Sequence, residues 1–87
     1  MNLNKISIGI IGMGYVGLPL AMEFAKKIKV VGFDIDSNRI TQLQNNIDIT
    51  KEISRSEFNN SRKILFSNNL ESIKCCDIFI ITVPTPV

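Results

Sequence analysis

The feature that most constrains this chain is the hexapeptide Gly-Met-Gly-Tyr-Val-Gly at residues 12–17. It follows the apolar run Ile6–Ile11, which is typical of a strand buried in a parallel sheet, and it leads directly into a helical pattern. A G-x-G-x-x-G pattern also arises by chance in loops. Between a strand and a helix, however, it predicts a turn that holds the pyrophosphate of a dinucleotide. The alternative is a tight strand–helix connection with no ligand.

Each glycine of the turn has a separate predicted task. Gly12 permits the sharp turn out of the strand, Gly14 lets the backbone approach the pyrophosphate, and Gly17 lets the helix pack closely. The N–H groups at the helix start, including those of Tyr15 and Val16, then face the phosphate oxygens, whose charge the helix dipole favours.

The second predicted strand, Lys29–Asp34, is closed by an acidic residue, and Asp36 follows two residues later. We expect Asp34 to accept hydrogen bonds from both adenosine ribose hydroxyls and to repel a 2′-phosphate, which favours NAD over NADP. Asp36 competes for this role, and spacing alone does not separate the two residues. Arg39 is predicted to stack on the adenine edge or to bond the ribose; the alternative is a solvated arginine on a helix surface.

Helical periodicity and capping signals fill the rest of the chain. The helix after the glycine turn has Pro19 in its first turn and the predicted buried stripe Val16, Leu20, Phe24 and Ile28, beside which Ala21 and Ala25 allow close approach. A second helix has Ser37 as its expected N-cap and Ile40, Leu43 and Ile47 as its buried stripe. The C-terminal half of the chain contains shorter predicted elements. A capping box predicts a short helix at Arg55–Asn60. The last elements are a strand at Ile64–Phe66, a short helix capped by Asn68 or Asn69 that carries Leu70 and Ile73, and a strand at Ile78–Val83.

Strands that alternate with helices predict an α/β fold: a Rossmann-type parallel sheet, in the partial order 3-2-1-4, with helices on both faces. The strand Ile78–Val83 is then an apolar edge strand, so we predict self-association or marginal stability. Val83, Pro84 and Thr85 follow the strand expected beside the first one and should line the cofactor crevice, where the Thr85 hydroxyl reaches a ribose or phosphate. A rigid turn with no ligand is the alternative.

Composition narrows the class of protein. The 87 residues suffice for one small domain, and a formal net charge of +2 with scattered basic residues gives no indication of nucleic-acid binding. No run approaches the ~18 apolar residues of a membrane span. With no histidine and two adjacent cysteines, we expect no metal site. Cys75 and Cys76 are interpreted as small buried residues in a reducing compartment, which predicts a cytoplasmic protein.

Three motifs together resemble the UDP-glucose/GDP-mannose dehydrogenase family. They are the turn with its continuation Leu18–Ala21, the segment Gly32–Asp36 with Arg39, and Thr82–Pro86. The sequence Leu-Pro-Leu-Ala after the turn, with Asp48–Thr50, looks most like the UDP-N-acetylhexosamine branch, which makes uronic acids for surface polysaccharides. The resemblance implies two NAD-dependent oxidation steps at the sugar C6 hydroxyl. It also implies that Tyr15, Val16, Asp34, Arg39 and Thr85 contact NAD.

The chain departs from this family in length. Family members run to several hundred residues, and their thioester-forming cysteine lies far downstream; Cys75 and Cys76 do not match it. We therefore expect residues 1–87 to be the N-terminal part of an NAD-binding domain, with catalytic and sugar-binding domains absent, no catalytic residue of its own, and no activity alone. A UDP-sugar would bind only to the full-length parent. The alternatives are a non-enzymatic nucleotide-sensing module and an N-terminal piece of a β-hydroxyacid-type dehydrogenase.

Overall fold

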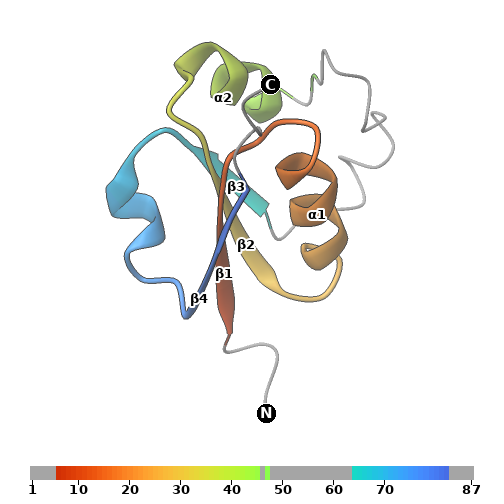
Figure 1. Cartoon of the computed structure of the whole chain (residues 1–87), viewed down its shortest axis with the longest axis vertical. Helices are drawn as coiled ribbons and strands as arrows, with labels where there is room; N and C mark the ends of the chain where they lie inside the picture. Colours follow the sequence, from red (N-terminus) through yellow and green to blue (C-terminus); the bar gives the residue numbers. More distant parts are fainter. Residues whose placement is uncertain (1–5, 46, 48–63, 83–87) are drawn as a thin grey trace.

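Short runs rich in isoleucine, valine and phenylalanine form the strands of this protein, as the preference of such side chains for a pleated surface predicts. The computed structural model describes residues 6–45, 47 and 64–82 (Figure 1). In chain order, the elements are β1 (Ser7–Ile11), α1 (Gly17–Phe24), β2 (Lys29–Phe33), α2 (Ser37–Gln44), β3 (Ile64–Ser67), the 3₁₀ helix η2 (Leu70–Ile73) and β4 (Ile78–Ile81). The helix expected at residues 55–60 lies outside the described residues.

The strands form one parallel sheet in the order β3-β2-β1-β4, so the predicted topology is confirmed. β1 lies in the interior of the sheet, with Ile11 paired to Phe33 of β2 on one side and to Ile81 of β4 on the other. The carboxyl ends of these three strands therefore meet at one edge, and the residues that follow them are brought together there.

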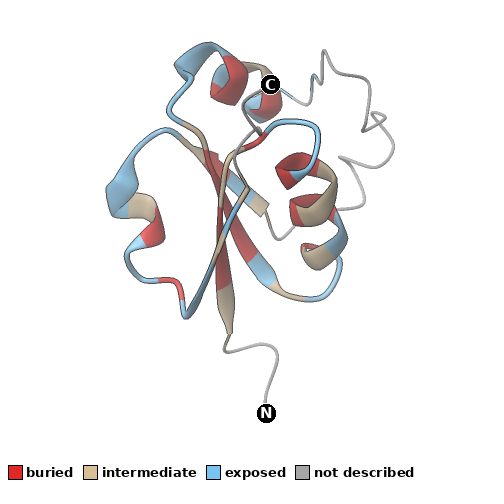
Figure 2. Ribbon diagram, viewed as in Figure 1, coloured by how far each residue is buried: buried red, intermediate tan, exposed pale blue. Residues whose placement is uncertain are grey.

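Helices α1 and α2 cover one face of this sheet. Their buried side chains join those of the strands in a single core, made of Ile8, Ile10, Met13, Leu18, Ala21, Met22, Ala25, Val30, Ile40, Leu43 and Phe66. In Figure 2 the buried segments lie along the centre of the sheet and on the helix surfaces that face it. Because each buried CH₂ contributes about 0.8 kcal/mol, this core dominates the stability of the domain.

The stripe predicted for α1 is only partly correct. Ala21 and Ala25 are buried, as expected for close approach to the sheet, while Leu20 and Phe24 are half-buried at its margin. Val16 is 69% exposed because it precedes the helix and lies in the turn. The face that α1 buries instead includes the large side chains of Leu18 and Met22, together with Ala21, so the buried stripe is rotated from the predicted one.

The start and end of α2 also differ from the prediction. The N-cap is Asp36, whose side chain accepts hydrogen bonds from the N–H groups of Asn38 and Arg39, and Ser37 is the first helical residue. The helix ends at Gln44, so Ile47 lies beyond it and is 46% exposed instead of buried. Ile40 and Leu43 are buried as predicted.

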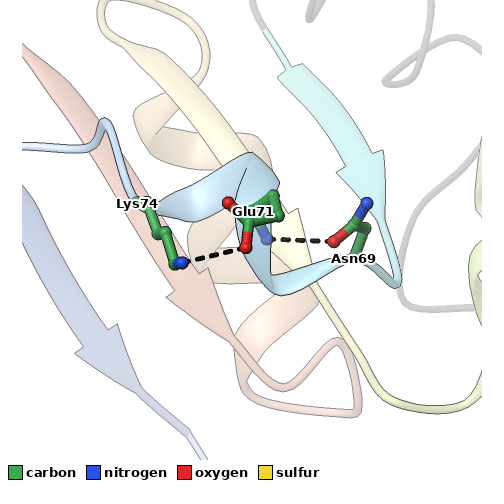
Figure 3. Close-up of polar contacts among 3 residues, drawn as sticks. All are labelled: Asn69, Glu71 and Lys74. Atoms are coloured by element: carbon green, nitrogen blue, oxygen red, sulfur yellow. Dashed lines mark hydrogen bonds and ion pairs between the residues drawn. The ribbon is translucent and has the colours of Figure 1, made fainter.

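The opposite face of the sheet is covered by η2, which Figure 1 shows on the other side from α1. Asn69 is its cap: its Oδ1 accepts from the N–H of Glu71 at 3.0 Å, and Glu71 forms an ion pair with Lys74 (Figure 3). Ile73 and Cys76 pack with Val31, Phe33 and Ile11 in a second, smaller core. Leu70 and Cys75 are exposed, so the expectation that both cysteines are buried is wrong for Cys75, which lies at a turn facing solvent.

Candidate dinucleotide-binding site

The glycine turn connects β1 to α1 at the carboxyl edge of the sheet. Gly12 has a φ of +102°, a left-handed conformation that L side chains rarely adopt, and a Cβ there would overlap the carbonyl oxygen of Thr82. A Cβ on Gly17 would overlap the carbonyl oxygen of Gly12. Both residues must be glycine for the helix to begin this close to the end of β4. The predicted tight turn is thereby present in the structure.

Gly14 differs from the other two glycines of the turn. A Cβ at this position would have no atom within 4 Å, and the residue is exposed. Protein packing therefore gives no reason for a glycine here. The first N–H groups of α1 lack partners within the helix, and the positive end of its dipole lies at the same place. An exposed glycine beside a helix N-terminus fits the pyrophosphate of a dinucleotide, because only a bound group would need the space.

Thr82 directly follows β4 and begins the Thr82–Pro86 motif, but it is not one of the residues predicted to contact the cofactor. Its N–H donates to the carbonyl of Ile11 at 2.8 Å, and its hydroxyl lies 2.9 Å from the carbonyl oxygen of Gly12. This contact joins the end of β4 to the glycine turn. The sequence contains one signal for this contact: Thr82 is a polar residue near the end of the apolar strand predicted at Ile78–Val83.

Asp34 directly follows β2, as predicted, and its carboxylate contacts the glycine turn. Oδ2 accepts from the N–H of Met13 at 2.8 Å, and Oδ1 accepts from the N–H of Asp36 at 2.9 Å. An ionised carboxylate has about four acceptor positions, so each oxygen retains capacity for a further hydrogen bond. Asp36 has a different task, because its side chain caps α2.

Arg39 is buried rather than solvated, with 8% of its surface exposed. Its Nε donates to the carbonyl oxygen of Met13 at 2.7 Å. Asp34 and Arg39 therefore both form a hydrogen bond with Met13.

Tyr15 and Val16 are each 69% exposed at the beginning of α1. The remaining predicted site residues, Val83, Pro84 and Thr85, lie outside the described residues.

The described residues also bear on metal binding and on membrane insertion. Within residues 6–45, 47 and 64–82, no group of histidine, cysteine, aspartate or glutamate side chains is arranged to hold a metal ion. In that same part of the chain, no helix is long and apolar enough to cross a membrane.

A parallel sheet in this order, with a glycine turn at a helix N-terminus and a carboxylate at the end of the next strand, defines a dinucleotide-binding Rossmann domain. More particularly, the chain belongs to the UDP-glucose/GDP-mannose dehydrogenase family: the model of that family's NAD-binding domain matches residues 6–87. The cofactor of this domain is NAD. The family resemblance seen in the sequence motifs is confirmed.

Known relatives agree with this assignment. The chain is 47% identical over 85 residues to UDP-N-acetyl-D-glucosamine 6-dehydrogenase of Salmonella typhi, covering 98% of this chain and 20% of that protein. It is 46% identical over 87 residues to Protein CapL of Staphylococcus aureus, with 100% and 20% coverage. Among solved structures, the UDP-N-acetyl-mannosamine dehydrogenase Cap5O of S. aureus superposes with a TM-score of 0.78 at 35% identity, over 92% of this chain and 20% of that one. The chain thus spans about one fifth of the length of these relatives.

Proposed function

We propose that this chain is the N-terminal, NAD-binding part of a nucleotide-sugar 6-dehydrogenase that oxidises a UDP-N-acetylhexosamine to its uronate. The family match and the names of the relatives support this substrate class. In this proposal residues 1–87 hold the cofactor, and the sugar-binding and catalytic groups belong to further parts of a longer protein. The chain has no histidine, and neither cysteine lies at the glycine turn.

The observation that carries the proposal is the geometry around the turn. Gly14 is open on the side a Cβ would occupy, and Asp34 lies beside it, bonded to Met13. NAD, when bound, accepts a hydride from the alcohol that is oxidised. The residues proposed to form its binding site are Gly12, Gly14, Tyr15, Val16, Gly17, Asp34, Arg39, Val83, Pro84 and Thr85.

Calorimetric titration of the chain with NAD and NADP tests cofactor binding. We expect NAD to bind and NADP to bind at least about tenfold more weakly, because the Asp34 carboxylate repels a 2′-phosphate. Asp34→Ala should abolish this preference and weaken NAD binding. Asp77→Ala is the matched control. The Asp77 carboxylate also accepts a hydrogen bond from a backbone N–H, that of Ser7 at 2.9 Å, but it lies at the amino end of β1, away from the glycine turn. Equal affinity of the unchanged chain for NAD and NADP would contradict the ribose assignment.

The substrate proposal is tested by NADH formation. A longer protein that contains this chain should reduce NAD when a UDP-N-acetylhexosamine is added, whereas the 87-residue chain should bind NAD without forming NADH. UDP-glucose serves as the comparison substrate. Faster NADH formation with UDP-glucose than with any UDP-N-acetylhexosamine would contradict the assigned branch.

We also propose two finer properties of this chain. One is self-association through β4, an edge strand of the described sheet on which Ile78, Phe79 and Ile81 are exposed. The other is a cytoplasmic location, which the exposed thiol of Cys75 suits because reducing compartments keep thiols free.

A further inference from the structure

Met13, the residue between the first two glycines of the turn, is held at three points. Its side chain is fully buried, and its Sδ would lie 2.6 Å from a Cβ placed on Gly32. Its N–H donates to Asp34 Oδ2 at 2.8 Å, and its carbonyl oxygen accepts from Arg39 Nε at 2.7 Å. A residue in a connecting turn is rarely fixed so completely, because turns usually lie on the surface and bond to water.

These contacts belong to a closed ring of hydrogen bonds. Asp34 Oδ1 accepts from the N–H of Asp36 at 2.9 Å, and Asp36 Oδ1 accepts from the N–H of Arg39 at 3.2 Å. The Arg39 Nε bond to Met13 and the Met13 bond to Asp34 close the ring. The ring joins the glycine turn, the end of β2 and the first turn of α2. The position of the turn therefore depends on α2, a helix that the G-x-G-x-x-G pattern does not include.

The bond from Arg39 also determines the direction of one N–H group. The Met13 carbonyl and the Gly14 N–H belong to the same peptide unit, which is planar and trans. They consequently point in opposite directions. Because Arg39 holds the carbonyl toward α2, the Gly14 N–H points away from Arg39, and the guanidinium charge polarises this peptide further.

We propose that Arg39 is a positioning residue of the pyrophosphate site, which holds the Met13–Gly14 peptide so that the Gly14 N–H donates to a phosphate oxygen. This inference rests on the proposed NAD site and gives Arg39 a role different from direct contact with adenine or ribose. With 8% of its surface exposed, Arg39 offers little area to a ligand. Its effect on binding is then transmitted through Met13.

The two roles of Arg39 are separated by comparing a ligand that lacks the pyrophosphate with two that contain it. Adenosine carries the adenine and ribose, whereas ADP adds the pyrophosphate and NAD adds the second nucleoside. Arg39→Met keeps the length and apolar stem of the side chain and removes the Nε donor. We expect this variant to bind NAD and ADP about tenfold more weakly, which is the loss of one hydrogen bond to a charged group, and adenosine within about twofold of the unchanged chain. The affinities are measured by NMR titration.

A second readout comes from the same spectra. In the unchanged chain, the Gly14 amide signal should move on addition of ADP and stay in place on addition of adenosine. Asn38→Ala is the matched control: Asn38 also donates its backbone N–H to the Asp36 cap but has an exposed side chain. This variant should bind all three ligands normally. If Arg39→Met does not fold, Arg39→Leu replaces it, because leucine also lacks a donor to the Met13 carbonyl.

Distinct results would overturn the inference. Equal loss of adenosine and ADP affinity in a folded Arg39 variant would assign Arg39 to direct contact with the nucleoside. Unchanged affinity for ADP would show that the Arg39–Met13 bond has no role in binding. An unchanged chain that binds neither NAD nor ADP would overturn the proposed function together with this inference, whereas the first two results leave the proposed function standing.

Discussion

At the scale of single residues, the same substitution should destabilise the fold at Gly12 and have little effect on stability at Gly14. Gly12→Val is expected to lower the free energy of unfolding by about 2 kcal/mol or more, because Gly12 has a φ of +102° and its Cβ would overlap Thr82. Gly14→Val should change that free energy by less than about 1 kcal/mol, since the position is open. Urea denaturation measures both values.

NAD binding by the Gly14→Val chain then tests why this position is a glycine. We expect a loss of affinity of at least about tenfold, because the added isopropyl group occupies the space through which the pyrophosphate approaches. Calorimetry on the folded variant measures it, with Asp77→Ala as the control, because Asp77 bonds to Ser7 at the amino end of β1. Normal NAD affinity in a folded Gly14→Val chain would contradict the pyrophosphate assignment.

The adjacent cysteines should differ in reactivity. Burial raises the pKa of the Cys76 thiol, and the charge of Asp77 and the neighbouring Cys75 raise it further, against a lowering contribution from a hydrogen bond to Ser7. Since the thiolate is the nucleophile, Cys76 should react only at higher pH than an ordinary thiol, while exposed Cys75 reacts first. Mass spectrometry after mild alkylation should locate the first label on Cys75. A native Cys75→Ser chain that is labelled as quickly as the unchanged one would contradict this prediction.

At the scale of elements, the start of α2 provides a test with its own control. Asp36→Ala should lower the free energy of unfolding by about 0.5–2 kcal/mol, because the Asp36 side chain accepts from two N–H groups of the first turn. Ser37→Ala should have little effect, since Ser37 is the first helical residue and not the cap. Urea denaturation of the two variants distinguishes the caps, and a larger loss for Ser37→Ala would contradict the observed one.

Periodicity and turn signals predicted the strands and their order because each strand is a short apolar run between polar segments. The capping signals were less accurate where two adjacent residues can both cap a helix. Asp36 and Ser37 are both good N-caps, and only the fold decides that α2 begins at Ser37. The predicted stripe of α1 was displaced because this helix has large apolar residues on adjoining faces: Leu18 and Met22 are buried, whereas Leu20 and Phe24 are only half-buried.

For the site, the sequence predicted the glycine turn and the position of Asp34 at the end of β2. It did not predict that Asp34 and Arg39 both bond to Met13, or that Thr82 bonds to Gly12. These contacts join residues far apart in the chain, and they form only once three strand ends meet at one edge of the sheet. Motif spacing carries no information about them.

At the scale of the whole molecule, the two edges of the described sheet differ in character. β4 exposes three large apolar side chains, with Ile78 44%, Phe79 50% and Ile81 68% exposed, whereas β3 exposes Leu65. An apolar edge strand with unpaired backbone groups offers a template for pairing with a second chain. We therefore expect the 87-residue chain to associate through β4 as its concentration rises, and sedimentation velocity measures this.

A lysine on this edge should prevent the association, because a charge there cannot be buried against a second strand. Ile81→Lys is therefore expected to keep the chain monomeric with little change in stability, since Ile81 is 68% exposed. Leu65→Lys places the same charge on the other edge, where Leu65 is 54% exposed, and should leave the association unchanged. If Leu65→Lys alone abolished the association, the contact would belong to β3. An unchanged chain that stayed monomeric at every concentration would show that the apolar surface of β4 does not drive pairing, and the predicted self-association would be wrong.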